Sequence, residues 1–295
     1  MHRAECYVVT GVSGRTGAAV ARTLIEAGEH VRVVVRDPAK GNVWARQGAQ
    51  VAVADLTDVR ALSDALSGAR GAYVLSPQHY ALDDLFARAE TVAGAIAEAA
   101  VAARLPKLVA LSSVGADRPD GTGWIGMNRM LEQRLGGIGL PVTFLRAGYF
   151  MENWAPMAGV AVTQGVLHSF LAPLDRAVPM VATADVGRVA AEALCEDWIG
   201  TRTITLEGPT SYSPNNVAEA FAQELGKPML ANAVPESSWA EALSHGGFSP
   251  AATAGFIEMT RALNSGHLSF ASDTGVDHRK GRVPLDTVVA AMAKA

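Results

Sequence analysis

The sequence predicts an α/β fold in which a doubly wound parallel sheet carries a smaller, mostly helical C-terminal lobe. Two observations lead to this prediction. In the first 150 residues, apolar runs of four to six residues alternate with longer segments of helical periodicity, as in strand–helix–strand crossovers. After Phe150 proline and glycine become frequent, and helical patterns dominate over strands.

Six strands are expected before Phe150. Their sequences, such as VRVVV, are nearly continuous apolar runs, which is typical of parallel strands buried on both faces. Right-handed crossovers then place helices on both faces of the sheet. The expected strands are Cys6–Thr10, Val31–Val35, Val51–Ala54, Ala72–Leu75, Lys107–Ser112 and Val142–Ala147.

Helices are expected between these strands and throughout the second lobe. The first helix runs to Ala27 and ends at Gly28. We assign residues 1–150 to one domain and 151–295 to the smaller lobe, with a segment at about 184–206 returning to the main sheet. Within that segment Asp185 is expected to cap the helix that follows it. The other expected helices are Leu82–Ala103, Ile125–Leu135, Asn215–Leu225, Ser237–Leu243 and Pro250–Leu263.

Composition and charge exclude several classes of protein. The 295 residues are 49% apolar and carry a net charge of −4, so the chain can fill a core but lacks the basic field of nucleic-acid-binding proteins. No apolar run reaches the ~20 residues that span a bilayer, and no signal-peptide cleavage pattern is present. We therefore expect a cytoplasmic protein with no nucleic-acid or membrane partner.

The cysteines and histidines indicate no metal site. The two cysteines form neither a disulfide framework nor a zinc cluster, and the histidines lack metal-ligand spacing. A homodimer is compatible with the sequence, which does not determine the oligomeric state.

The segment TGVSGRTG at residues 10–17 lies between the first strand and the first helix. This is the context of a dinucleotide fingerprint and predicts a Rossmann-type doubly wound parallel sheet. Gly11 allows a tight turn, Gly14 lets a pyrophosphate approach the backbone, and Gly17 lets the helix pack close to the strand. The alternative is a structural turn without a ligand. The residues expected to bind the cofactor here are Gly11, Val12, Ser13, Gly14, Arg15, Thr16 and Gly17.

The end of the second strand indicates which dinucleotide binds. An NAD site usually carries an acid there, whereas VVVRDPAK places Arg36 at the strand end and Lys40 one helical turn later. These cations, with Arg15, suit the 2′-phosphate of NADP(H). Two alternatives remain open: the cations are solvated surface charges, or Asp37 serves NAD. Asp55 and Leu56 end the third strand and flank the adenine, or else Asp55 caps the next helix.

Seven segments together resemble the NmrA-like family of the atypical short-chain dehydrogenases/reductases. They occur in the order of the family and cover nearly the whole chain. The family includes NADPH-dependent quinone reductases, triphenylmethane reductase, isoflavone-reductase-like enzymes, and redox-sensing regulators that bind the dinucleotide without turnover. The segments are TGVSGRTG, VVVRDPAK, VADLTD, LSSVGAD, LPVTFLRAGYFMEN, TADVGRVAAEAL and TLEGPTSYSP.

No tyrosine has a lysine four residues later, so the Tyr-xxx-Lys pair of many short-chain dehydrogenases is absent. Members of the resembled family often carry Lys or His four residues before a Glu on the helix after the fifth strand. Here these positions hold Asn128 and Glu132. Asn128 cannot be a general base, although it can hydrogen-bond the nicotinamide ribose or a substrate carbonyl. Glu132 is equally compatible with a structural ion pair and with a site role.

The ends of the strands predict the rest of the site, because ligands lie there in open α/β sheets. The resemblance places Gly148, Tyr149 and Phe150 near the nicotinamide. The remaining expected cofactor residues are Ser76, Pro77, Gln78, Ser112, Ser113 and Asn128. The expected substrate-pocket residues are His79, Val114, Tyr149, Phe150, Asn153 and Trp154, and the catalytic candidates are Asn128 and Tyr149. As alternatives, the aromatic residues belong to a core between the lobes, and His79 is a surface histidine.

The sequence as a whole favours an NADP(H)-binding oxidoreductase. A quinone-like or other conjugated acceptor suits a site without a Tyr-Lys pair, because its reduction needs the acceptor held against the nicotinamide and no protein acid. The alternative function is a redox-sensing regulator that binds NADP(H) without turnover and acts through a protein partner. The glycine turn serves both functions, so the turn does not distinguish them.

Overall fold

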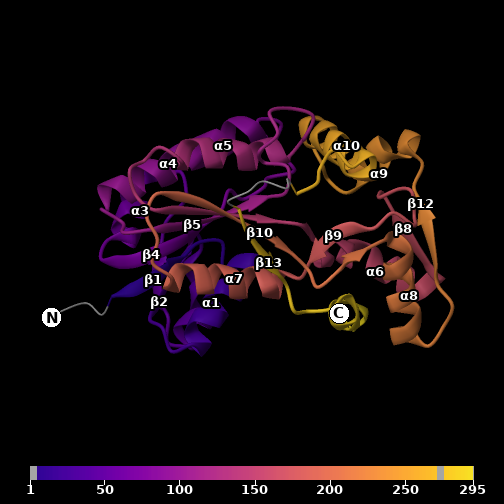
Figure 1. Ribbon diagram of the computed structural model, residues 1–295, viewed down its shortest axis with the longest axis horizontal. Helices are drawn as coiled ribbons and strands as arrows, with labels where there is room; N and C mark the ends of the chain where they lie inside the picture. Colours follow the sequence, from indigo (N-terminus) through magenta and orange to yellow (C-terminus); the bar gives the residue numbers. More distant parts are fainter. Residues whose placement is uncertain (1–4, 271–275, 295) are drawn as a thin grey trace.

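The computed structural model describes residues 5–270 and 276–294. Within these residues, eight parallel strands form one sheet in the order β13-β10-β6-β5-β4-β1-β2-β3 (Figure 1). The part β3-β2-β1-β4-β5-β6 has the Rossmann strand order, and β10 and β13 extend it. The strands are β1 (Cys6–Val9), β2 (Val31–Val35), β3 (Gln50–Val53), β4 (Ala69–Val74), β5 (Leu108–Ser113), β6 (Val142–Ala147), β10 (Thr201–Glu207) and β13 (Asp277–Lys280).

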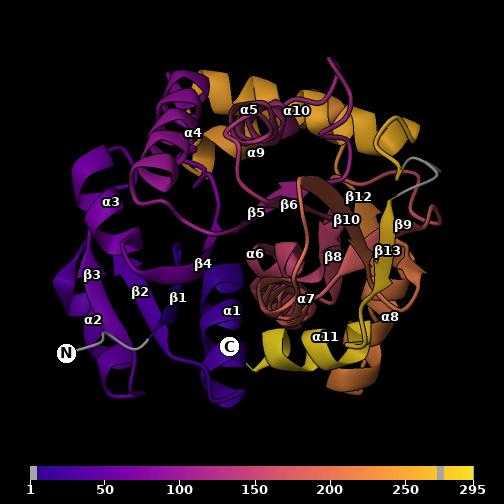
Figure 2. The ribbon, with the colours of Figure 1, turned by 60° about the vertical axis from the view of Figure 1, so that its left-hand side comes forward.

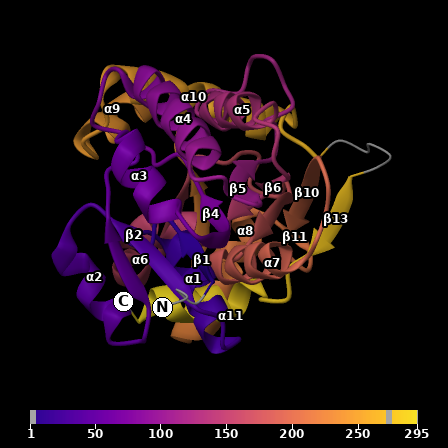
Figure 3. The ribbon, with the colours of Figure 1, turned by 90° about the vertical axis from the view of Figure 1, so that its left-hand side faces the viewer.

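Helices cover both faces of the sheet, which confirms the predicted fold class (Figures 1 and 3). Side chains alternate between the two layers, so Tyr7 and Val9 face one apolar core and Val8 faces the other. One face carries α1 (Arg15–Glu26), α2 (Pro38–Ala45) and α7 (Thr183–Cys195). The opposite face carries α3 (Val59–Leu66), α4 (Leu85–Ala102) and α5 (Ile125–Leu135).

The second lobe packs beside the sheet around its own apolar core (Figure 2). In it β7 (Tyr149–Phe150), β9 (Val178–Val181) and β11 (Ser211–Tyr212) form a small sheet, and β8 (Val166–Ser169) pairs with β12 (Leu230–Ala233). Its helices are α6 (Ala155–Gln164), α8 (Pro214–Leu225), α9 (Trp239–His245), α10 (Pro250–Ser265) and α11 (Leu285–Ala293), with short 3-10 turns η1 (Met151–Trp154) and η2 (Glu236–Ser238).

Helices α1 and α7 lie side by side although more than 150 residues separate them (Figures 2 and 3). The contact requires a glycine, because a Cβ on Gly187 would stand 2.4 Å from the Cβ of Ala19. Val20 and Leu24 of α1 pack into the same core as Val186 and Val189 of α7. The helix that follows the glycine turn is therefore supported by a segment from the second half of the chain.

The expected capping role of Asp185 is wrong. Helix α7 begins at Thr183, whose backbone N–H and hydroxyl donate to the carboxylate of Glu152 at 2.9 and 2.6 Å. Asp185 lies inside the first turn and is 2% exposed; its Oδ2 accepts the backbone N–H groups of Arg282 and Val283, both at 2.8 Å. A carboxylate from the 3-10 turn after β7 thus takes the capping position, and Asp185 instead holds the chain after β13.

Strand β13 is an addition to the expected sheet. Its sequence DHRK has no apolar residue, and it pairs with β10 at the outer edge (Figure 3). An edge strand needs backbone pairing on one side only, so hydrophobic patterning does not reveal it. No helix within the described residues is long and apolar enough to cross a membrane.

Candidate functional site

The glycine turn lies between β1 and α1 at the edge of the sheet where the strands end. Gly11 has φ +68°, and its carbonyl accepts the backbone N–H of Gly14 at 2.9 Å. Gly14 is the N-cap of α1 and supplies no side-chain hydrogen bond to the helix. The first N–H groups of α1 are therefore open to an anion, where the helix dipole also favours negative charge.

Two of the three glycines are required by close packing. A Cβ on Gly17 would stand 2.5 Å from the carbonyl oxygens of Thr10 and Gly11, and a Cβ on Gly11 would stand 2.8 Å from Cδ2 of Leu75. A Cβ on Gly14 would meet only the Gly11 oxygen at 3.4 Å, an ordinary contact. Gly14 is exposed, so its lack of a side chain leaves room outside the protein.

Other residues of the turn divide between interior and surface. Ser13 and Arg15 are exposed, beside the open N-terminus of α1. Val12 and Thr16 are buried, and a contact of either residue with the cofactor remains a prediction. Arg15 forms no ion pair with the described residues.

Two exposed cations follow β2. Arg36 and Lys40 form no ion pair with any described residue, so their charges are available to a ligand. Asp37 is engaged elsewhere, because its Oδ1 accepts the N–H of Ala39 at 2.9 Å and caps α2. One oxygen of the acid that could serve NAD is therefore committed to a helix cap, whereas the two cations beside it form no ion pair with a described residue.

Asp55 follows β3 and forms a turn with Thr57. Its Oδ1 accepts the backbone N–H of Thr57 at 2.9 Å and the hydroxyl at 2.7 Å. These hydrogen bonds, assisted by Arg88 and Arg36, hold the pKa of Asp55 below its usual range. Asp55 does not cap α3, because that position belongs to Asp58. Leu56 is buried next to it.

His79 belongs to the same neighbourhood. Burial lowers the pKa of His79, and Arg88 and Arg36 lower it further, while Asp55 acts in the opposite direction. The imidazole therefore lies among the charges that follow β2 and β3.

The loop after β4 connects the sheet to an aromatic cluster. Ser76 has a buried hydroxyl without a hydrogen-bond partner among the described residues. Pro77 is half-buried, and Gln78 accepts a hydrogen bond from the hydroxyl of Tyr80. The Tyr80 ring stacks on Trp124 at 4.2 Å and on Phe248 at 4.9 Å between centroids.

Glu132 of α5 has a structural role in an ion pair. Glu132 accepts the hydroxyl of Ser112 at 2.5 Å and forms two hydrogen bonds with Arg146 of β6, at 2.9 and 2.7 Å. It is therefore the centre of a buried ion pair that joins α5 to β5 and β6. Asn128 lies one turn earlier, nearer the strand ends, and its half-buried amide makes no hydrogen bond to a described residue. Ser113 ends β5 with an equally free hydroxyl.

The segment after β6 joins the two lobes. The N–H of Gly148 donates to the carbonyl of Leu206 at 2.8 Å, and a Cβ there would stand 2.7 Å from the oxygen of Pro179. Tyr149 and Phe150 are half-buried and pair with β9. Phe150 packs against the core of the sheet, whereas Tyr149 packs against the core of the second lobe.

Tyr149 and its neighbours differ in how far they reach the surface. Burial raises the pKa of Tyr149, with a hydrogen bond to Asn153 acting in the opposite direction. Asn153 is exposed, while Trp154 is 3% exposed and meets the Tyr149 ring edge-to-face at 6.3 Å. Trp154 and Val114 are packed in the interior, so a pocket role for either remains a prediction.

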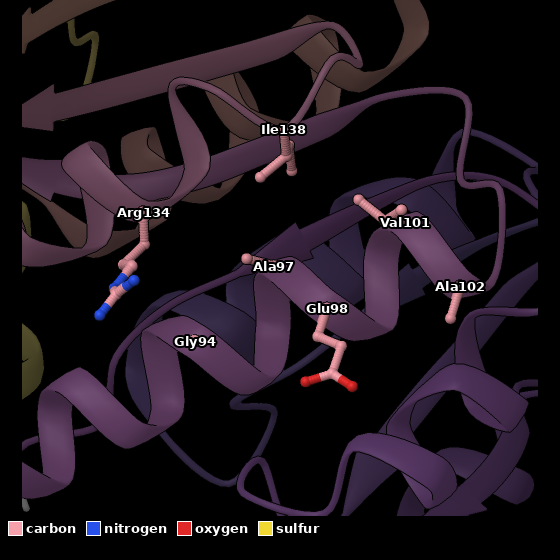
Figure 4. Close-up of a pocket in the computed structure, with 7 residues that line it drawn as sticks. All are labelled: Gly94, Ala97, Glu98, Val101, Ala102, Arg134 and Ile138. Carbon is pink, nitrogen blue, oxygen red and sulfur yellow. The ribbon is translucent and has the colours of Figure 1, made fainter.

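A cavity of about 460 Å³ lies outside this set of residues (Figure 4). It is a shallow space between α4 and α5, and no residue predicted for the site contributes to it. Its lining residues are Gly94, Ala97, Glu98, Val101, Ala102, Arg134 and Ile138. The strand ends, not this cavity, carry the polar and charged groups described above.

Comparison with known proteins places the chain in a family. Residues 5–284 match the model of the NmrA-like family. The chain belongs to the NmrA-like family. This confirms the resemblance read from the seven sequence segments.

The curated relatives of this NmrA-like protein include two reductases. It is 30% identical to the NAD(P)H azoreductase of Xenophilus azovorans over 226 residues, which cover 75% of this chain and 74% of the relative. It is 27% identical to quinone oxidoreductase 2 of Escherichia coli strain K12 over 245 residues, 80% of each chain.

Solved structures share the fold of this NmrA-like protein. The NADPH-dependent quinone oxidoreductase of Escherichia coli complexed with NADPH superposes with a TM-score of 0.79 at 24% identity, covering 97% of this chain and 99% of the other. Triphenylmethane reductase of Citrobacter sp. gives a TM-score of 0.80 at 20% identity, covering 98% of this chain and 100% of the other.

Proposed function

We propose that this protein is an NADPH-dependent oxidoreductase that reduces quinone-like or other conjugated small molecules. The observation that carries the proposal is the open N-terminus of α1 beside Arg36 and Lys40, which have no ion-pair partner among the described residues. Backbone donors suit a pyrophosphate, and the two cations suit the 2′-phosphate. The names of the relatives, an azoreductase and a quinone oxidoreductase, support the same reaction class.

The site residues would bind two different ends of the cofactor, the adenosine end and the nicotinamide end. Ser13, Gly14 and Arg15 would hold the pyrophosphate through backbone and side-chain donors. Arg36 and Lys40 would hold the phosphorylated ribose. The adenosine end would also include Asp55 and Leu56. His79, which the sequence predicts for the substrate pocket, would lie at this end instead, because Arg88, Arg36 and Asp55 act on its pKa. The nicotinamide end would include Ser76, Pro77, Gln78, Ser112, Ser113, Asn128, Gly148, Tyr149 and Phe150.

When bound, NADPH supplies a hydride to the acceptor. The protein orients the acceptor and excludes water from its flat face. Phe150 and Tyr149 present half-buried rings for this purpose, and Asn128 and Asn153 offer amide donors at the rim. The raised pKa of Tyr149 keeps its hydroxyl neutral, so it can donate a hydrogen bond to an acceptor oxygen without becoming the base. The reduced oxygen then takes its proton from water.

The experiment is to follow NADPH oxidation against a panel of simple quinones, azo dyes and triphenylmethane dyes, with NADPH affinity measured in parallel by calorimetry. We expect steady turnover with at least one acceptor, and a raised KM for that acceptor in Phe150→Ala. Arg46→Gln, a surface change at the far end of α2, serves as the control.

Tight NADPH binding without turnover on any acceptor would contradict the enzyme proposal. It would support the sensor if NADPH and NADP⁺ also changed binding to a protein partner differently. The relatives with reductase names do not favour that alternative.

A small-molecule substrate is the partner that this reaction requires. A cytoplasmic location, the lack of a nucleic-acid partner and a homodimer remain expectations from the sequence. Size-exclusion chromatography with light scattering would decide the oligomeric state.

A further inference from the structure

Arg88, which the sequence analysis did not single out, faces Asp55 across the adenosine end of the site. Its Nη2 lies 3.7 Å from Oδ1 of Asp55, and the two side chains are 29% and 39% exposed. The Nε of Arg88 is buried without a hydrogen-bond partner among the described residues, so packing holds the guanidinium in place. Thr57 holds the carboxylate separately, through hydrogen bonds of 2.9 and 2.7 Å.

The position of this pair follows from the fold. Asp55 follows β3 where that strand ends, and Arg88 lies in the first turn of α4, which begins after β4 at the same edge. Arg36 follows the neighbouring strand β2. Arg36, Arg88 and Asp55 all influence the pKa of His79, so the three charges share one neighbourhood.

Asp55 is unfavourable for a phosphate at this position. Its pKa is held low first by the Thr57 hydrogen bonds, so the carboxylate is ionised at neutral pH. An uncompensated carboxylate repels a nearby phosphate dianion. Asp55 cannot relieve the repulsion by turning away, because Thr57 fixes it.

We propose that Arg88 neutralises Asp55 and thereby keeps the adenosine end selective for the cofactor that carries the 2′-phosphate. Arg88 is a specificity-determining residue that acts through Asp55, whereas Arg36 and Lys40 attract the phosphate directly. The inference rests on the proposed function, because it places the adenosine ribose beside Arg36.

Calorimetric titration of the purified protein with NADPH and with NADH tests the inference. In Arg88→Gln we expect NADPH affinity to fall about fivefold at low ionic strength, because Asp55 then repels the 2′-phosphate. NADH affinity should stay within about twofold, because NADH lacks the 2′-phosphate. High salt should reduce the difference. Arg88→Lys should keep most of the NADPH affinity, since it keeps the charge.

The double variant Arg88→Gln/Asp55→Asn tests directly whether Arg88 acts through Asp55. It should restore NADPH affinity to within about twofold of the wild type, because the repelling carboxylate is gone. Arg46→Gln is the matched control: it removes the same charge at the end of α2 that points away from the strand ends, and should change neither affinity.

A second readout does not depend on the cofactor. The pKa of His79, followed by NMR in the protein without ligand, should rise in Arg88→Gln and fall in Asp55→Asn. A purely structural role for Arg88 would not shift it in opposite directions in the two variants.

Three results would overturn the inference. Equal losses for NADPH and NADH in Arg88→Gln would make Arg88 a contact common to both cofactors. An unchanged NADPH affinity in Arg88→Gln would show that Arg88 does not contribute to cofactor selectivity. If Asp55→Asn failed to restore NADPH affinity in the double variant, Arg88 would not act through Asp55. If the wild type bound neither cofactor, the proposed function would fail and this inference with it.

Discussion

Asn128 occupies the position where the resembled enzymes often have a lysine or histidine, one turn before Glu132. An amide cannot accept a proton at neutral pH, so we expect Asn128 to orient a ligand and to do no acid–base chemistry. Tyr149, the other catalytic candidate, has a pKa raised by burial and no lysine beside it in sequence. Both residues therefore suit an acceptor whose reduction needs positioning more than protein-borne protons.

The variant Tyr149→Phe, which lacks only the hydroxyl, tests whether Tyr149 positions the acceptor without supplying a proton. The ring and its contact with Trp154 are kept, so NADPH-dependent reduction should slow by less than about tenfold, the effect of one lost hydrogen bond. The measurement is kcat with the best acceptor of the panel. Tyr212→Phe, in the small sheet of the second lobe, is the matched control. A thousandfold loss in Tyr149→Phe would identify it as a proton donor after all.

At the scale of an element, two glycines of the turn between β1 and α1 have different surroundings. Gly17 allows α1 to approach β1, because a methyl group there would overlap two backbone oxygens. Gly14 has room on the protein side and is exposed on the other. The lack of a side chain at Gly17 is therefore a requirement of folding, and we propose that the lack of one at Gly14 makes room for the ligand.

The two glycines should therefore respond differently to alanine. Gly17→Ala should lower the free energy of unfolding by about 2–3 kcal/mol, since backbone must move to admit the methyl. Gly14→Ala should change stability by less than about 1 kcal/mol but weaken NADPH binding, because its methyl enters the space of the phosphate. Urea denaturation and calorimetry are the measurements.

Gly94→Ala is the control for the substitution itself. Gly94 lies inside α4 with nothing within 4 Å of its Cβ position, so alanine should stabilise the helix by about 0.5–1 kcal/mol. An equal loss of stability in Gly14→Ala and Gly17→Ala would contradict the division of roles.

Elements with strong patterns were predictable from the sequence. The strands Val31–Val35 and Val142–Ala147 and the helix Ile125–Leu135 have the predicted bounds. The two strands are apolar runs, and the helix has buried apolar residues at Ile125, Leu131 and Leu135. The short strands of the second lobe and the charged β13 were not predicted. Their stability comes from pairing with segments distant in sequence, which no local pattern records.

For the whole molecule, two carboxylates, the half-buried Glu152 and the buried Asp185, join the lobes to the sheet. Glu152, just after β7, caps α7, and Asp185 of α7 holds the backbone after β13. Gly281 fits beside Asp185 only without a side chain, since a Cβ would stand 2.5 Å from Oδ2. The helix that supports α1 is thus linked at its first turn to both lobes.

Asp185→Ala should destabilise the whole protein. It leaves the N–H groups of Arg282 and Val283 without an acceptor and removes one of the two carboxylate partners of Arg188, so the free energy of unfolding should fall by about 2–4 kcal/mol. Urea denaturation measures it. Glu241→Ala, an exposed site on α9 with no ion pair to the described residues, should change stability by less than about 0.5 kcal/mol. Equal effects of the two variants would refute the linking role.

Much of the candidate site was predictable, because glycine spacing and charges at strand ends are local signals. Ser13, Arg15, Arg36 and Lys40 are exposed at the expected edge. Arg88 was not predicted, because its partner Asp55 lies 33 positions earlier in the sequence. From the sequence alone, an arginine in a helical segment cannot be distinguished from an ordinary surface charge. The buried role of Glu132 likewise depends on Arg146, a contact that only the assembled sheet creates.

The pairing of α1 with α7 has a consequence for the order of events during synthesis. The glycine turn leaves the ribosome long before the helix against which α1 packs, because that helix begins only at Thr183. Until that segment emerges, the face of α1 that carries Ala19 lacks its native cover. A nascent chain that ends before Thr183 already contains the glycine turn but exposes apolar surface on α1 beside it, the kind of intermediate that chaperones recognise.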